Sequence, residues 1–193
     1  MTLYDNRSTL WIGFHGCDRS VRDCLLSHPF DVRISNESYD WLGAGFYLWE
    51  NNYLRAKQWA DDKGKRTKGG FEPAVVGVLY ELGNCIDLTC AESVDTISKA
   101  YNSLKLEYEN INLELPKNRA TKHSLYEDLI LRDLDCAVIN YLCSTVSTNI
   151  DTARGVFIEG GPVYEGGKIY EKTHIQICIK NLDCIKGFFM PKV

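Results

Sequence analysis

The first clear pattern in the chain is an alternation of side chains in residues 10–15, LWIGFH. A period of two predicts a β-strand whose two faces carry different residues, with His15 on the face opposite Phe14. We expect the next two residues to turn the chain. Asp18 is a typical N-cap, so a helix is predicted after it, closed by Pro29.

Further strands are predicted where β-branched and aromatic residues cluster between turn signals. These segments are 43–49 (a glycine turn leading into a strand), 73–82, 154–158, 173–180 and 184–189. Within 173–180 the isoleucines form one face, whereas His174, Gln176 and Cys178 form the other. Polar side chains on a strand face need water, a partner or a ligand, so an edge strand and a ligand site both fit this pattern.

Apolar residues at spacings of three and four predict amphipathic helices, which span 53–60, 92–108 and 124–143. Asn51 or Asn52 is the expected N-cap of the first of these helices. The charged run at 61–70 is predicted to be a loop, as are the polar stretch 111–123 and the glycine-rich segment 159–168. This order of elements indicates an α+β fold.

Length and composition indicate a folded domain. The chain has 193 residues, of which 45% are hydrophobic, and a net charge of −4. We therefore expect one domain over 1–193 with a helical elaboration at about 92–143, and we expect no dedicated nucleic-acid binder. The first sixteen residues lack the apolar core of a signal peptide, and no apolar run is long enough to span a bilayer. A cytoplasmic protein without membrane association is the resulting expectation.

The eight cysteines and four histidines raise the question of a metal site. None of the cysteines forms a C-x-x-C pair, and no arrangement of two ligand pairs is present. In a reducing compartment the cysteines are expected to be free thiols that fill the core. We therefore predict no metal ion.

Three short motifs carry the remaining chemical signal, although each alone has a structural explanation. They are FHG at 14–16, GAGFYLW at 43–49 and HIQICI at 174–179. A histidine at a strand end followed by glycine suits a ligand-binding corner, and a half-buried structural histidine gives the same pattern. Two glycines before aromatic residues allow a close backbone approach to a ligand or to a neighbouring strand.

In combination these motifs resemble the ADP-ribosyltransferase fold. More specifically, they resemble the branch that uses a His, Tyr, Glu signature and is typified by poly(ADP-ribose) polymerases and diphtheria-type toxins. Small bacterial domains of the same superfamily that carry a glutamine on the late strand are also similar. The matching segments are 10–16, 43–48, 56–60 and 176–181, at both ends of the chain. The resemblance implies a split β-sandwich with flanking helices and NAD as substrate, and it assigns no counterpart to 92–143.

The resemblance also implies roles for individual residues. His15 would bind the ribose on the adenine side, and Gly16 would offer its backbone to the nicotinamide carboxamide. Tyr47 would stack on the nicotinamide ring, with Trp59 as a second face and Gly45 in the same NAD-binding set. An aromatic face attracts a flat cationic ring by roughly 0.5–2 kcal/mol.

The third signature residue departs from the family pattern, because Gln176 stands where the family places a glutamate. Glutamine binds a ribose hydroxyl but carries no charge to steady the developing cation. Glu171 is the second candidate for this role, and Glu159 or Glu165 are further alternatives. On the same strand face, His174 is expected in the NAD-binding set, where it holds the acceptor or acts as a general base.

Two cysteines, Cys17 and Cys178, are expected to line the same cleft. The first functional hypothesis is a mono-ADP-ribosyltransferase that modifies a protein or a nucleic acid, in a toxin-like or defence setting by analogy of fold. A catalytically degenerate module that binds NAD or ADP-ribose is the second. A scaffold that presents the helices at 92–108 and 124–143 to a partner is the third.

Overall fold

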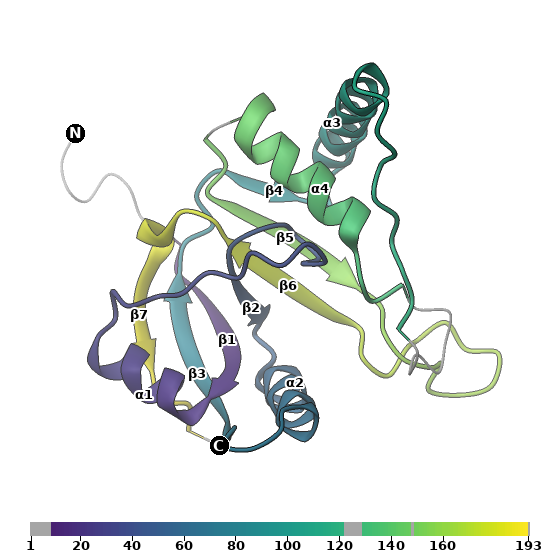
Figure 1. Ribbon diagram of the computed structural model, residues 1–193. Coiled ribbons are helices and arrows are strands. Elements are labelled where there is room, and N and C mark those ends of the chain that lie inside the picture. Colours follow the sequence, from purple (N-terminus) through teal and green to yellow (C-terminus); the bar gives the residue numbers. More distant parts are fainter. Residues whose placement is uncertain (1–8, 122–128, 148, 193) are drawn as a thin grey trace.

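A computed structural model describes residues 9–121, 129–147 and 149–192 (Figure 1). The described residues form an α+β fold with a seven-stranded mixed sheet in the order β4-β5-β6-β2-β1-β3-β7. The strands are β1 (Trp11–Asp18), β2 (Phe46–Glu50), β3 (Pro73–Tyr80), β4 (Cys85–Asp87), β5 (Thr152–Phe157), β6 (His174–Ile179) and β7 (Ile185–Phe189). The α-helices are α1 (Arg19–Ser27), α2 (Tyr53–Arg66), α3 (Ala91–Asn110) and α4 (Asp133–Tyr141). None of these helices is long and apolar enough to cross a membrane.

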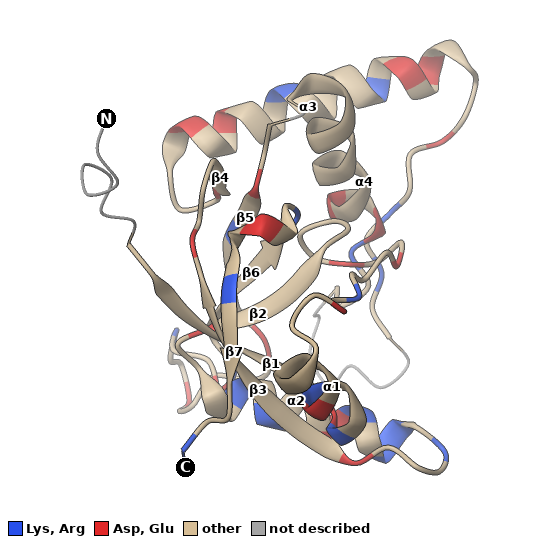
Figure 2. Cartoon of the chain, turned by 90° about the vertical axis from the view of Figure 1, so that its left-hand side faces the viewer, with Lys and Arg blue, Asp and Glu red and all other residues tan. Residues whose placement is uncertain are grey.

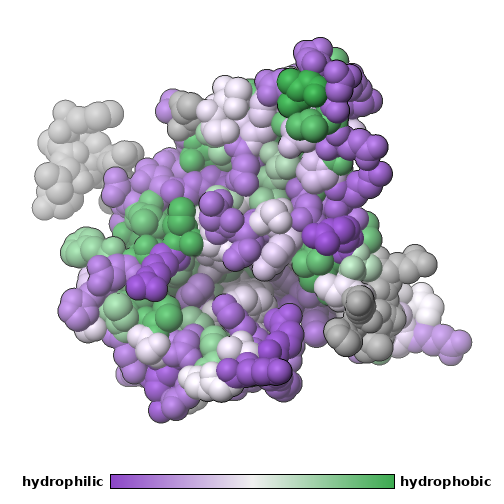
Figure 3. Space-filling model, in the orientation of Figure 1, coloured by the Kyte–Doolittle hydropathy of each residue, from purple (hydrophilic) through white to green (hydrophobic). Residues whose placement is uncertain are grey.

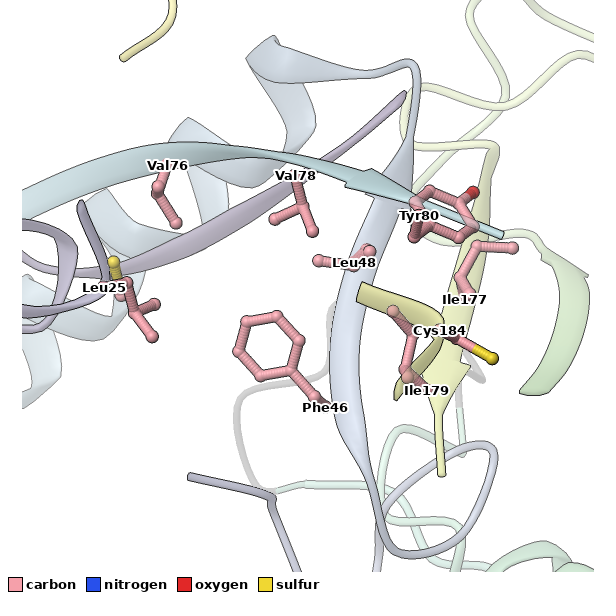
Figure 4. Close-up of a cluster of buried hydrophobic side chains, with 10 residues drawn as sticks. Leu25, Phe46, Leu48, Val76, Val78, Tyr80, Ile177, Ile179 and Cys184 are labelled. Atoms are coloured by element: carbon pink, nitrogen blue, oxygen red, sulfur yellow. The ribbon is translucent and has the colours of Figure 1, made fainter. Parts of the chain in front are cut away.

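One face of the sheet packs into the main core. Phe46 and Leu48 of β2, Val76 and Val78 of β3 and Ile177 of β6 converge there, as Figure 4 shows. Leu25 of α1 covers them and is itself buried. This arrangement confirms the predicted apolar face of the strand at 173–180, and it places β6 in the middle of the sheet rather than at an edge.

The opposite face of the sheet is covered by two separate groups of elements. Over β1, β2 and β3 lies α2, whose Ala56 packs with Trp49 and Val75. Over β5 and β6 lies α4, whose Ile139 packs with Phe157 and with Cys178. Between these two groups of elements the surface is hollowed near the centre of the molecule (Figure 3).

The helix predicted at 124–143 is shorter at its N-terminal end. Residues 122–128 lie outside the described part of the chain, and Leu131 is bridged to Arg119 instead of being helical. The helix α4 begins at Asp133, and acidic residues in its first turn suit the positive end of the helix dipole. A π-helical turn at Leu142–Val146 follows it.

The charged run at 61–70 is helical as far as Arg66, so the predicted loop is wrong for its first six residues. Lys57 pairs with Asp61 and Lys65 with Asp62 along the helix surface. Basic residues in the last turn also suit the negative end of the helix dipole. The run of charge is therefore a solvated helix face.

Other predicted features hold. Asp18 and Asn52 cap α1 and α2 with their side chains, and α3 covers the predicted 92–108. Acidic and basic residues are spread along α3 at the outside of the molecule (Figure 2). The short strand β4 and the 3-10 turn Leu182–Cys184 had no signal in the sequence pattern.

Candidate functional site

The candidate site lies where β1 separates from β2. β1 pairs with β3 along its whole length but pairs with β2 only at Gly13 and Phe14. Beyond this point β2 continues to pair with β6 on its other side, from Phe46 to Trp49. The sheet is therefore open between the second half of β1 and the first half of β2.

His15 is the first residue of β1 beyond the paired segment, and its side chain crosses the opening. Its Nδ1 lies 2.8 Å from the backbone oxygen of Tyr47. Because a carbonyl only accepts, Nδ1 carries the proton and Nε2 is left as an acceptor. Burial lowers the pKa of His15 to about 4, so the ring is neutral at physiological pH.

The hydrogen bond between His15 and the Tyr47 oxygen also decides whether the Gly16 amide is paired with β2. The backbone of Asn51 donates to the oxygen of Ile12, so strand alternation directs the N–H of Gly16 to the β2 side as well. In a continued ladder this N–H would reach the oxygen of Tyr47, but the register ends at Phe14. The His15 ring donates to the Tyr47 carbonyl instead, and the Gly16 amide faces the opening.

Gly16 also lies directly against α2. A Cβ at this position would stand 2.3 Å from the backbone oxygen of Ala56 and 3.3 Å from the ring of Trp59. The ring of Trp59 is 5.6 Å from that of Trp49, and the amine of Lys63 lies 4.8 Å from its centroid. The structure thus brings Trp59 beside Gly16 and explains why only glycine fits there.

The side chain of Tyr47 projects from β2 on the face opposite His15, and the His15 ring lies 4.4 Å from that of Phe46. The Tyr47 hydroxyl donates to the oxygen of Gly43 at 2.6 Å and accepts from the amide of Leu42 at 2.9 Å. Burial raises the pKa of this phenol well above its usual value. Tyr47 therefore secures the glycine turn that precedes its own strand.

The glycine turn is held from two other elements. Asn140 of α4 accepts from the amide of Ala44 at 2.8 Å, and Lys180 donates to the oxygens of Leu42 and Ala44. A Cβ at Gly45 would stand 2.4 Å from the sulfur of Cys178 and 2.6 Å from the oxygen of Ile179. A side chain at Gly45 would therefore collide with β6, while the backbone of Gly45 pairs with Ser35.

Gln176 and Tyr47 project from the same face of the sheet, since β2 pairs Tyr47 with Cys178 and Trp49 with Gln176. The side chain of Gln176 is half-buried and lies 3.0 Å from Nε2 of His174. His174 is only 4% exposed, and its Nδ1 bonds the oxygen of Lys172 at 2.6 Å. Both ring nitrogens of His174 are thus in use, which disagrees with its predicted role as acceptor-binding residue or general base.

The carboxylates near Gln176 are arranged differently from the prediction. Glu171 is exposed, and its carboxylate accepts a hydrogen bond from the amide of Gly161. Glu165 is exposed in the same loop. Glu159 is the carboxylate that reaches this face, where it forms an ion pair with the buried Arg55 and approaches His174 Nδ1 to 3.7 Å.

The two cysteines expected in the cleft are both buried. Cys17 lies in the main core, on the His15 side of the sheet, and burial raises its pKa to about 12. Cys178 is fully buried under the glycine turn, where burial raises its pKa to about 11. Neither thiol is activated as a nucleophile. Among the described residues, no group of three or more His, Cys, Asp and Glu is placed to hold a metal ion.

Aromatic residues complete this face and were not singled out by their sequence context. Trp41 and Phe157 lie 4.8 Å apart, and each has its ring centroid about 6 Å from that of His174. The guanidinium of Arg132 lies 4.4 Å from the ring of Trp41. These three side chains also line a cavity of about 600 Å³ between β5 and the helices α3 and α4. Trp41 and Arg132 lie far from His174 in the sequence, so only the folded structure brings this group of side chains together.

In comparisons with known proteins, no protein-family model matches the chain, and no significant match is found among curated proteins or solved structures.

Proposed function

We propose that the chain is an NAD-dependent mono-ADP-ribosyltransferase, which cleaves the bond between nicotinamide and ribose and transfers ADP-ribose to a protein or a nucleic acid. The observation that carries the proposal is the opening between β1 and β2, where His15 donates a hydrogen bond to the carbonyl of Tyr47 and the Gly16 amide faces the opening. This geometry provides a backbone donor, a neutral imidazole acceptor and aromatic rings within one short stretch of strand.

Each of these groups has a place in the reaction. The Gly16 amide donates to the carboxamide oxygen of nicotinamide, and the ring of Trp59 beside it offers an aromatic face. Nε2 of His15 accepts from a ribose hydroxyl, because Nδ1 is already bonded to Tyr47. Tyr47 supports NAD through its ring and through the turn that its hydroxyl secures.

Gln176 binds the nicotinamide ribose through its amide in this proposal. As nicotinamide leaves, positive charge develops on the ribose, and an uncharged amide stabilises it less than a carboxylate does. Removal of one pre-organised electrostatic group typically lowers a rate by about 10²–10³-fold. Glu159 does not supply the missing charge, since its carboxylate is paired with Arg55. We therefore expect slow turnover in the absence of an acceptor.

The test measures binding of NAD and release of nicotinamide with the purified protein. His15→Ala removes the ribose acceptor and the contact to Tyr47, so we expect at least tenfold less nicotinamide release. Tyr47→Ala is expected to reduce release similarly. Tyr47→Phe keeps the ring and removes only the two hydrogen bonds to the turn, so it should retain more activity than Tyr47→Ala.

A useful control is Leu54→Ala, since Leu54 is an exposed residue of α2 outside the site. This variant should release nicotinamide at the wild-type rate. Release that is indifferent to His15→Ala and to Tyr47→Ala would exclude the opening between β1 and β2 as the reaction site.

A module that binds NAD without chemistry is the second candidate, favoured by Gln176 in place of a carboxylate. Calorimetry would then show NAD binding, while nicotinamide stays absent over hours. Gln176→Glu distinguishes the two functions. Nicotinamide release by the wild type supports the transferase, whereas release that begins only in Gln176→Glu supports the binding module.

A further inference from the structure

His174 and Gln176 form a hydrogen-bonded pair on β6, and a backbone oxygen bonds the other side of the His174 ring. His174 is 4% exposed, and its Nδ1 lies 2.6 Å from the oxygen of Lys172. Its Nε2 lies 3.0 Å from the amide nitrogen of Gln176. The two residues are two positions apart on one strand, so they share a face of the sheet.

The chemistry of these contacts fixes the orientation of the Gln176 amide. The oxygen of Lys172 only accepts, so Nδ1 of His174 must carry the proton. In the neutral ring Nε2 is then an acceptor, and the group that faces it must be a donor. Of the two ends of the amide, only the NH₂ of Gln176 donates. The oxygen Oε1 of Gln176 therefore points away from His174.

We propose that His174 is a positioning residue, which holds the Gln176 amide with its NH₂ on the imidazole and its oxygen towards the bound ribose. The inference rests on the proposed function, because it assigns the hydroxyl-accepting atom within that site. A glutamate offers two equivalent oxygens and needs no such guide. A glutamine offers one oxygen and one NH₂, and the wrong orientation presents a donor where the ribose hydroxyl needs an acceptor.

The surroundings of His174 keep its ring in place and neutral. Trp41 and Phe157 flank the ring, and its side chain has no exposed surface. The charged groups around it are Arg55 from α2, Glu159 from the loop after β5, and Arg132 next to α4. Burial lowers the pKa of His174, and the two arginines lower it further, whereas Glu159 and the Lys172 carbonyl oppose this shift.

Protonation of His174 would reverse the pair. Nε2 of a charged imidazole donates, so the amide of Gln176 would turn to offer its oxygen to His174 and its NH₂ to the ribose. Activity that depends on the guided amide should therefore fall on the acid side of the pH profile. Replacement of Gln176 by glutamate should remove the need for the guide.

The experiment is a double-mutant cycle of His174→Leu and Gln176→Glu, with kcat and KM for nicotinamide release measured across pH. Circular dichroism checks that each variant is folded. We expect His174→Leu to lower kcat about tenfold or more in the wild-type background and by less than about threefold in the Gln176→Glu background. His174→Gln, which again offers an acceptor to the Gln176 NH₂, should recover most of the loss.

The outcomes separate the two proposals. An equal loss of kcat in both backgrounds would show a merely structural role for His174 and overturn its positioning role alone. Absence of nicotinamide release in the wild type and in every variant would overturn the proposed function. In that case the ¹⁵N resonances of the imidazole and of the Gln176 amide still test the pair, because a ring protonated at Nε2 would contradict the orientation derived above.

Discussion

The side chain of His15 connects β1 to β2 at the point where their backbone pairing ends. Its ring replaces the backbone donor that would continue the ladder with Tyr47, and so frees the amide of Gly16. The resemblance of the combined motifs to the ADP-ribosyltransferase fold predicts His15, Gly16 and Tyr47 in one site. It could not reveal this substitution, because a hydrogen bond between a side chain and a strand leaves no trace in hydrophobic periodicity.

The depressed pKa of His15 predicts a pH-dependent stability. The unfolded chain binds a proton at its ordinary pKa near 6.5, whereas the folded chain binds it only near pH 4. The unfolded state therefore holds more protons between these values, and stability falls as the pH drops through this window. From pH 7 to pH 5 the contribution of His15 is about 2 kcal/mol.

Urea unfolding at both pH values measures this effect. His15→Gln lacks the titrating group, so its free energy of unfolding should decrease less than that of the wild type between pH 7 and pH 5. His174 acts in the same direction in both proteins, since its pKa is also lowered by burial. Equal decreases in the two proteins would contradict the lowered pKa of His15.

At the scale of elements, the position of α2 depends on a close contact with β1. Gly16→Ala would place a Cβ 2.3 Å from the backbone oxygen of Ala56, so the helix must move. Overpacking of this kind typically costs about 1–3 kcal/mol. NAD binding should weaken as well, because Trp59 moves with the helix.

The matched control is Gly187→Ala on β7, where an added Cβ meets no atom within 4 Å. Its free energy of unfolding should stay within about 0.5 kcal/mol of the wild type. Denaturant titrations of the two variants provide the comparison. If Gly16→Ala is as stable as Gly187→Ala and binds NAD normally, the contact between β1 and α2 has no role in the site.

Elements with a strong local signal were predictable, and those that depend on distant partners were not. The capping residues Asp18 and Asn52 and the isoleucine face of β6 follow from local physics. The strand β4 exists because it pairs with β5, and Arg154 of β5 also bonds Asp87 of β4 and Glu50 of β2, which lies on the far side of β6. Such partners lie tens of residues apart, where periodicity carries no information.

The same distinction applies to the candidate site. The motifs located β1, the glycine turn and β6, because each is a continuous run of residues. The group formed by Arg55, Glu159 and His174 draws on α2, the loop after β5 and β6, so only the folded sheet brings it together. The predicted alternatives to Gln176 included Glu159, but not the arginine that neutralises it.

At the scale of the whole molecule, the sheet consists of two halves that meet at β1 and β2. One half carries α1 and α2 and the other carries α3 and α4, with the hollow between them (Figures 1 and 3). The net charge is −4, so under the proposed function the affinity for anionic NAD comes from local donors and aromatic faces rather than from the overall field.

The proposed transferase activity is tested most directly by mass spectrometry of the purified protein incubated with NAD and cell lysate, with His15→Ala in a parallel reaction. We predict that the wild type releases nicotinamide and attaches ADP-ribose to a protein or nucleic acid, and that His15→Ala does so at least tenfold more slowly. If NAD loss and ADP-ribose attachment are the same with the wild type, with His15→Ala and without added protein, the opening between β1 and β2 is not a transferase site.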